Sequence, residues 1–400
     1  MKHDLSNADI FESTWDYQDI SNEGQTGFQP FYLRIIQNVL CNEESDAPVC
    51  SPACMIPWLA VLAELSSGRT QKQILDAMGM KDIASFSQAA DAMMCEIESK
   101  VEEGGICNLS SSVWLNQGKD CQCSRQTTLE KQLKLCHTDI FAGETGSDSM
   151  NGELRKWLDE CTGGKLKDQV SGVSLERGIQ AALFSTIYFK SGWNIEFSEP
   201  YRAVFHGEDR NGKCQMMKGM ADLPYFWGDQ FGAVCLDLTG SLLGGEIFLI
   251  LPDENRSINT VLKSSSFYEL MTKREEYPYQ KLAKTKLYLP QIRADAEINL
   301  VSYLEKEGIR DAFDAQTADF SPLLDLENLS GPFCVSRAEH SVHLEWNELG
   351  IECAAYTGGW LKGAAMPALK NVTFRLDRPF IYLIMSIDGT PLFAGAVRNL

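Results

Sequence analysis

The spacing of apolar residues indicates helices in the first part of the chain. From Phe28 onward, the segment FQPFYLRIIQNVL places apolar residues three and four positions apart, which is the period of an amphipathic helix. Residues 53–68, ACMIPWLAVLAELSSG, are apolar almost all round, as in a buried helix. Ser51 and Pro52 precede this run and suit the cap and the first helical position. We therefore expect the buried helix to open at Ser51-Pro52.

Further helical patterns follow, whereas the N-terminal residues show little periodicity. Residues 1–27 are polar and acidic, which predicts a loose arm. A helix through RTQKQILDAMG is expected to end at Gly79. Other predicted helices cover residues 84–102, 125–136, 148–161, 257–272 and 298–307.

Strand patterns dominate the second half of the chain. Runs rich in β-branched and aromatic residues begin at 106–116 and 178–190. Later runs are YRAVFHG, GKCQMMKG, FGAVCLDLTG, GEIFLILPD, FCVSRAEHSVHLEWNELG, NVTFRL, RPFIYLIMSI and TPLFAGAV. Helices gathered early and strands gathered late predict an α+β fold. No Pro/Gly/Ser-rich linker divides the chain, so we expect one domain over residues 28–400.

The segment between two of these strands is unusual. Residues 348–370 read ELGIECAAYTGGWLKGAAMPALK, which is too long for an ordinary hairpin connection. Its first part nevertheless alternates, with Ile351, Cys353 and Ala355 on one side, as in a half-buried strand. One interpretation is a surface loop that can also become a strand. The other is a long loop whose alternation arises by chance.

The charge of the chain argues against two classes of partner. A formal net charge of -19 disfavours nucleic acid and an anionic membrane surface, because both attract basic proteins. The sequence has no apolar run of about 20 residues, so we expect no membrane-spanning helix. It also begins without the apolar run of a secretory signal. A cytoplasmic protein, or one exported without a signal peptide, is favoured, and an extracellular location stays open.

Candidate chemistry is sparse. None of the five histidines stands in a metal-binding spacing, and there is no Gly-X-Ser-X-Gly elbow or phosphate-binding glycine loop. The 13 cysteines are odd in number, which favours reduced thiols over a disulfide framework. We therefore predict neither enzyme activity nor a cofactor or metal. A cysteine hydrolase is a minor alternative that needs a reactive thiol beside a histidine.

Several segments together resemble the serpin family, from about Phe28 to Leu400. Ser51-Pro52 before the buried helix resembles the start of that family's second helix. The segments TGGKLKD, STIYFKSGW and ADFSPL match its motifs in order and spacing, as do FCVSRAEHSVHLEWNELGIECAA, RPFIYLIM and PLFAGAV. The resemblance implies a serpin fold of three β-sheets, eight or nine helices and an exposed reactive-centre loop.

The resemblance also implies a mechanism. A serine protease cuts the loop and forms its acyl-enzyme, and the cut loop then inserts into the main sheet and traps the protease. A non-inhibitory serpin acting as a carrier or chaperone is the alternative.

We expect the protein to be a monomer. We also expect no glycosaminoglycan site, because the helix over residues 84–102 is acidic and Lys281, Lys284 and Lys286 suit a solvated face.

The resemblance assigns a hinge at the start of the loop. Glu348 and Gly350 begin it, and Ile351, Cys353, Ala355 and Thr357 would turn inward and become buried on insertion. Gly350, Ala354 and Ala355 match the family's small residues, whereas Ile351 and Cys353 depart from its pattern. Both departures are uncharged, so insertion remains the favoured interpretation. A charged residue or a proline at an inward position would favour the non-inhibitory alternative, and the sequence has neither there.

Two further regions are carried over from the family. The shutter, which controls opening of the sheet, usually joins two serines, an asparagine and a histidine. Its counterparts here are Ser51, Cys54, Ser185 and His340, so two of the four positions differ, and we expect a weaker network. Trp193 matches the family's tryptophan at the breach, where the loop enters the sheet.

The scissile bond follows from counting along the loop. Sixteen residues beyond the hinge glutamate the count gives Ala364-Ala365, which suits an elastase-like pocket. Counting back from Pro379 gives Ala368 instead. Lys362 or Lys370 would suit a trypsin-like protease. The predicted partner is therefore a serine protease, with an elastase-like enzyme favoured.

Overall fold

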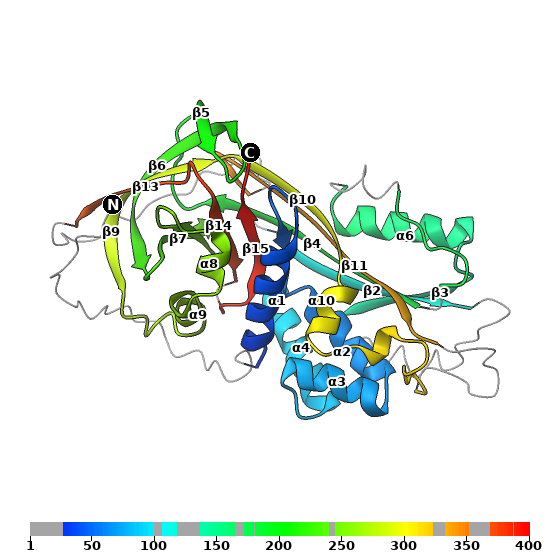
Figure 1. Cartoon of the computed structure of the whole chain (residues 1–400). Helices are drawn as coiled ribbons and strands as arrows, with labels where there is room; N and C mark the ends of the chain where they lie inside the picture. The colour runs from blue at the N-terminus through cyan, green and yellow to red at the C-terminus, as the bar shows by residue number, and fades with distance from the viewer. Residues whose placement is uncertain are drawn as a thin grey trace.

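A computed structural model gives the fold of the chain (Figure 1). It describes residues 27–99, 106–117, 137–164, 172–179, 181–239, 245–322, 333–351, 369–386 and 388–400. Residues 1–26 of the predicted N-terminal arm and the helix predicted at 125–136 lie outside these residues. The described helices are α1 (Gln29–Asn42), α2 (Met55–Leu65), α3 (Gly68–Met78), α4 (Ile83–Ser99), α6 (Asp148–Cys161), α8 (Ile258–Leu262), α9 (Ser265–Thr272), α10 (Val301–Lys306) and the 3₁₀ turn η2 (Asp311–Phe313).

The buried helix α2 begins later than predicted. Ser51 does not cap it: the Ser51 hydroxyl donates to Sγ of Cys54, and the Ser51 backbone N–H donates to the side chain of His340. A short turn follows, in which the N–H of Met55 donates to the carbonyl of Pro52 at 3.1 Å. The first helical residue is therefore Met55, and Cys54 at the cap position makes no side-chain capping bond.

One predicted helix is two helices in the structure. The helix predicted at 257–272 is interrupted after Leu262, where Ser264 caps α9 by accepting a hydrogen bond from the N–H of Phe267. By contrast, α3 ends as expected, with Gly79 left-handed at φ 68°. The helix α6 and the strand β2 keep their predicted bounds.

The strands alternate with few helices after residue 180, which confirms the α+β class. They are β1 (Val49–Cys50), β2 (Ile106–Asn116), β3 (Thr138–Gly143), β4 (Ala181–Trp193), β5 (Tyr201–His206), β6 (Asn211–Trp227), β7 (Phe231–Thr239), β8 (Glu246–Pro252), β9 (Gln280–Pro290), β10 (Ile292–Asn299), β11 (Val335–Asn347), β12 (Gly350–Ile351), β13 (Asn371–Arg375), β14 (Phe380–Met385) and β15 (Pro391–Val397).

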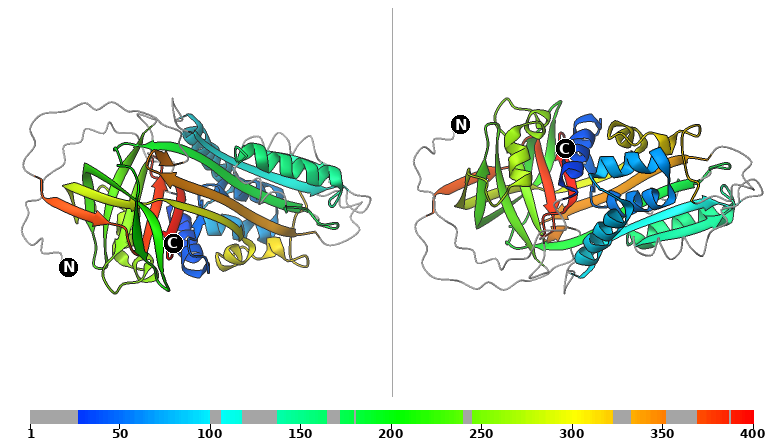
Figure 2. Two further views of the ribbon diagram at one scale, coloured as in Figure 1. Left: turned by 90° about the horizontal axis from the view of Figure 1, so that it is seen from above. Right: turned by 90° about the horizontal axis from the view of Figure 1, so that it is seen from below.

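The described strands fall into three groups that share long strands. The main sheet has the order β3-β2-β4-β11-β10, in which β4 and β11 are parallel neighbours that run side by side (Figure 2). A second group runs β1-β15-β14-β8-β7, and a third joins β5, β6, β9 and β13. Pairing of β7 with β4 and with β6 joins the groups into one network of 15 strands.

Helices cover both faces of the main sheet. Successive residues of a strand point to opposite faces, and the core follows that alternation. Leu183 and Ile187 of β4 belong to the large core that includes α2, whereas Ala182 and Phe184 pack in a smaller cluster with Trp157 of α6. Accordingly, α6 lies on one face of the sheet, and α2, α3 and α4 lie on the other (Figure 1). Among the described helices, none is long and apolar enough to cross a membrane.

Candidate functional site at the β4–β11 seam

The two central strands of the main sheet are paired along only part of their length. Residues 181–187 of β4 pair in parallel with residues 335–342 of β11, ending at the pair Ile187 and Val342. We call this segment the closed end of the seam. Here the two strands share a direct hydrogen-bonded ladder, so a third strand enters only by breaking it.

A buried polar network lies across the closed end. His340 of β11 stands opposite Ser185 of β4 in the ladder, and their side chains meet at 3.1 Å between Nδ1 and Oγ. The backbone N–H of Ser51 donates to Nε2 of His340 at 2.8 Å. Because an N–H can only donate, Nε2 carries no proton, and Nδ1–H is therefore the donor to Ser185.

Cys54 completes the network on the side of α2. The hydroxyl of Ser51 donates to its Sγ at 3.1 Å, and the thiol in turn donates to the carbonyl of Thr186 at 3.5 Å. The four residues carried over from the family as a shutter therefore form one connected network. Sequence analysis missed Thr186, since a residue that acts through its backbone carbonyl leaves no side-chain signal.

Burial keeps this network neutral. His340 is completely buried, and the loss of hydration lowers the pKa of its imidazole to about 4. Burial also raises the pKa of the Cys54 thiol to about 12. At neutral pH the network holds no net charge, so every bond in it joins neutral groups.

The other end of the seam is held apart by a third segment. After the turn at residues 348–349, β12 reverses direction and lies between the two strands. Gly350 and Ile351 pair with residues 346–347 of β11 on one side and residues 191–192 of β4 on the other. We call this the wedged end of the seam. The first strand-forming residues of the hinge are therefore already part of the main sheet.

Ile351 is buried in this state, contrary to expectation. The sequence predicts that its side chain becomes buried when the loop inserts, yet its exposed fraction is already 0%. The reason is the pairing of β12 with both neighbours, which places Ile351 in the core of the sheet. A substitution of Ile351 should therefore affect the stability of the intact protein, before the loop is cut.

Two glycines permit the close approach at the wedged end. Gly350 is buried, pairs with Gly192 and has φ 153°, a backbone conformation that other residues rarely adopt.

The turn before Gly350 is held by a side-chain hydrogen bond. The Glu348 carboxylate accepts this bond from Nε2 of Gln291 at 2.7 Å. The turn that leads into β12 is thus tied to the rest of the structure at its first residue.

Aromatic residues anchor the wedged end. The indole N–H of Trp193 donates to the carbonyl of Asn347 at 2.7 Å and so joins the ends of β4 and β11. Its ring meets that of Trp346 edge to face at 6.3 Å, and Trp346 itself donates to the carbonyl of Pro290. Trp193 therefore lies beside the first residues of the predicted hinge.

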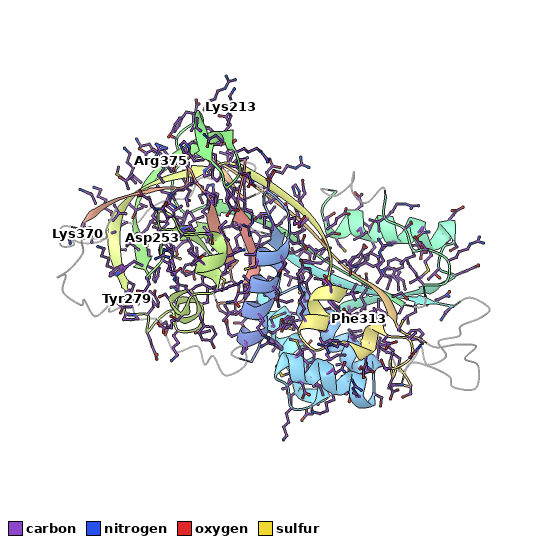
Figure 3. All side chains as sticks on the ribbon, in the orientation of Figure 1. Lys213, Asp253, Tyr279, Phe313, Lys370 and Arg375 are labelled. Atoms are coloured by element: carbon purple, nitrogen blue, oxygen red, sulfur yellow. The ribbon has the colours of Figure 1, made fainter. Side chains whose placement is uncertain are left out.

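Most of the predicted bait loop lies outside the described residues. This applies to Cys353, Ala354, Ala355, Thr357, Lys362, Ala364, Ala365 and Ala368. Lys370 is described: its carbonyl accepts a hydrogen bond from the N–H of Lys284, directly before β13 pairs with β9. Figure 3 labels Lys370, which directly precedes this strand, and Arg375, its last residue.

Comparisons with known proteins agree with this architecture. A family model described as Serpin (serine protease inhibitor) matches residues 27–400. Antichymotrypsin-2 of Bombyx mori is 25% identical over 395 residues, which cover 94% of this chain and 98% of the relative. Serpin B9 of Homo sapiens is 24% identical over 360 residues, covering 88% and 93%. A serpin-like protein of Thermococcus kodakarensis is 31% identical over 370 residues, covering 87% and 80%.

Solved structures give the same result for the fold. The thermophilic serpin tengpin in its native state has a TM-score of 0.81 at 21% identity, with 96% of each chain covered. Human thyroxine-binding globulin, complexed with thyroxine, has a TM-score of 0.77 at 18% identity, with 94% of this chain and 99% of that chain covered. Because the family match spans nearly all of the sequence and the folds agree, the chain belongs to the serpin family.

Proposed function

We propose that this protein is a serine protease inhibitor that acts as a suicide substrate. A protease attacks the bond Ala364-Ala365 and forms an acyl-enzyme. The freed loop then extends β12 along the seam between β4 and β11 and carries the protease with it. Trapping requires insertion to be faster than hydrolysis of the acyl-enzyme.

The observation that carries the proposal is the position of β12. Its two residues already pair with both central strands, in the place where the first inserted residues must lie. The β4–β11 ladder ends at Ile187 and Val342, so residues 188–190 and 343–345 lie between the wedged and closed ends. An inserting strand therefore has a paired start and a direction of travel toward the network around His340.

The energetics favour insertion once the loop is cut. Each inserted residue can add a ladder hydrogen bond worth about 0.5–1.5 kcal/mol net. Roughly a dozen residues then give about 10 kcal/mol with each neighbouring strand, and the two new ladders together exceed the cost of breaking the seven β4–β11 pairs and one polar network. The intact loop cannot reach this state in full, because both of its ends are held by the fold.

The contact at Lys370 bears on the choice of scissile bond. A protease needs an extended segment whose backbone is free to pair with the enzyme. The Lys370 carbonyl is already bonded to Lys284, which makes this residue a poorer site than Ala364. An elastase-like protease is therefore the favoured target, and Lys362 is the better site for a trypsin-like one.

The test is incubation with a panel of serine proteases, followed by denaturing electrophoresis. We expect an elastase-like enzyme to form a complex that survives denaturation, together with a C-terminal peptide that begins at Ala365. The same protease with its nucleophile blocked serves as the control and should form no such complex. A protein that is cut without any complex, and is not stabilised by the cut, would be the non-inhibitory carrier or chaperone instead.

A further inference from the structure

Three potential metal ligands meet away from the seam, on the surface between α4 and β3. Asp91 and Cys95 lie one helical turn apart on α4, and His137 directly precedes β3. Nε2 of His137 is 3.1 Å from Oδ1 of Asp91 and 3.7 Å from Sγ of Cys95. One ligand atom from each residue lies within 4.8 Å of the other two. The sequence gives no hint of this cluster, because the histidine is 42 residues from the cysteine.

We propose that Asp91, Cys95 and His137 bind a divalent transition-metal ion of the zinc class. Zinc has bond lengths of about 2.0–2.1 Å to nitrogen or oxygen and about 2.3 Å to sulfur. In a tetrahedron, these bonds place neighbouring ligand atoms about 3.3–3.6 Å apart. The two separations to His137 bracket that range, so small rotations of side chains on a partly exposed surface suffice to complete the site.

The types of ligand select the ion. A thiolate and an imidazole suit zinc and related ions, whereas calcium and magnesium prefer sites made of oxygen. Among the described residues, the cluster consists of these three side chains. Asp91 and His137 are half-buried and Cys95 is exposed, so an ion can reach all three from solvent.

The geometry favours a metal over a catalytic cysteine. In a catalytic triad, the histidine bonds the nucleophile through one ring nitrogen and the acid through the other. Here both Asp91 and Cys95 approach Nε2 of His137. The carboxylate therefore does not orient the imidazole toward the thiol. Three different ligand atoms within 4.8 Å of one another are an arrangement that suits a metal ion.

A bound ion would join two separate parts of the fold. The helix α4 packs on α2 and belongs to the layer beneath the main sheet, whereas β3 is an edge strand that pairs with β2. The ion would link this edge to the helical layer. It should therefore stabilise the folded chain in proportion to its concentration, because the unfolded chain holds the three ligands far apart.

The experiment uses the full-length, reduced protein and Co²⁺ as a spectroscopic probe, with Zn²⁺ as competitor. We expect a thiolate-to-cobalt absorption band that zinc abolishes, and a melting temperature that rises by a few degrees at saturating zinc. The variants Cys95→Ser, Asp91→Asn and His137→Asn should each weaken binding at least about tenfold. Asparagine is chosen at 137 because it tolerates the left-handed backbone, φ 48°, found there.

Two matched controls decide whether the effect belongs to this cluster. Cys161→Ser removes a partly buried cysteine of the helix α6, and His206→Asn removes an exposed histidine in β5. Both should bind cobalt and zinc as the wild type does. The proposal is overturned if any of the three ligand variants keeps the full absorption band, or if the controls lose it to the same degree. None of these measurements depends on protease inhibition, so a failure of this proposal can be distinguished from a failure of the proposed function.

Discussion

The two ends of the β4–β11 seam are built from the same two strands but are held in different ways. At the closed end, the strands pair directly, and a neutral buried network that includes Ser185 and His340 spans them. At the wedged end, the strands do not touch through a ladder, since Gly350 and Ile351 lie between them. One end resists a third strand, and the other already contains the beginning of one.

If the loop inserts as proposed, this difference indicates where the seam would begin to open and what would oppose it. Each residue added to β12 would replace one pairing between β4 and β11 with two new pairings, one to each strand. Extension is therefore favourable once the loop has been cut. The ladder ends at the pair Ile187 and Val342, and the polar network lies two pairs beyond it, at Ser185 and His340. This network is the first obstacle to an extending strand. In the proposed mechanism, the wedged end would set the direction of insertion, and the closed end would set its barrier.

The largest expected effect comes from cutting the loop, which should make the two ends alike. A protease cut within residues 363–371 frees the strand to fill the whole seam. We expect the melting temperature to rise by about 10 °C or more, because roughly 10 kcal/mol of new pairing is added to a protein of this size. Calorimetry of cut and intact protein measures it. A cut form that melts at or below the intact temperature would rule out insertion.

The next effect tests the wedged end itself. Ile351→Arg places a charge in a fully buried position, which costs several kcal/mol unless it is paired. Contrary to what the alternation alone predicts, the intact protein should already lose stability. Insertion should also slow, so that cleaved protein accumulates at the expense of the complex. Urea unfolding and the ratio of the two bands on a gel measure these effects.

Leu349→Arg is the matched control for this variant. Leu349 lies two residues earlier, in the turn that leads into β12, but 42% of its surface is exposed. Its replacement should change stability by less than about 0.5 kcal/mol and leave the ratio of complex to cleaved product unchanged. Equal behaviour of the two variants would mean that Ile351 is not buried at the wedged end in solution.

Some features of the fold could be predicted from the sequence, and others could not. The periodicity of apolar residues and the turn signals located β2 and α6 to the residue, because their patterns are long and end at clear breaks. The family resemblance placed Ser51, Cys54, Ser185 and His340 in one network. Alternation in residues 351–355 identified a segment able to become a strand. This alternation gave no information on which residues are already paired with β4 and β11 in the intact protein.

Other features depend on tertiary contacts that leave no local pattern. The start of α2 was predicted at Ser51-Pro52 because both are good helix-opening residues. In the structure, Ser51 instead belongs to the buried network, where its hydroxyl donates to Cys54 and its N–H donates to His340, from a strand far along the chain. Similarly, β3 was not predicted, since this edge strand alternates weakly and depends on pairing with β2. The cluster of Asp91, Cys95 and His137 arises from the same packing.

The third prediction concerns pH and the closed end. The pKa of His340 is lowered from its ordinary 6.5 to about 4 in the folded protein. Between these values the unfolded chain binds a proton that the folded chain does not, so stability falls as pH falls from 6.5 to 4. The full loss amounts to about 3 kcal/mol. Above pH 6.5 this residue should contribute no pH dependence.

Comparison with His340→Asn isolates this contribution from the many carboxylates that titrate nearby. Both proteins are unfolded with urea at several pH values between 7 and 4. The variant is less stable at pH 7, and the difference from the wild type should shrink by about 3 kcal/mol toward pH 4. A difference that stays constant over this range would show that the histidine is not held neutral by burial.

The smallest effect separates the two serines of the network. In Ser185→Ala, the buried Nδ1–H of His340 loses its acceptor, which costs about 1–3 kcal/mol because a strong donor is left without a partner. In Ser51→Ala, the hydroxyl that is lost donates to the sulfur of Cys54, a weak acceptor, while the bond from the Ser51 backbone N–H to His340 remains. This change should cost less than about 1 kcal/mol. Urea unfolding at pH 7.5, where His340 is neutral, compares the two variants directly. If Ser51→Ala costs as much as Ser185→Ala, the side chain of Ser51 matters more than its backbone, and the assignment of bonds around His340 given above is wrong.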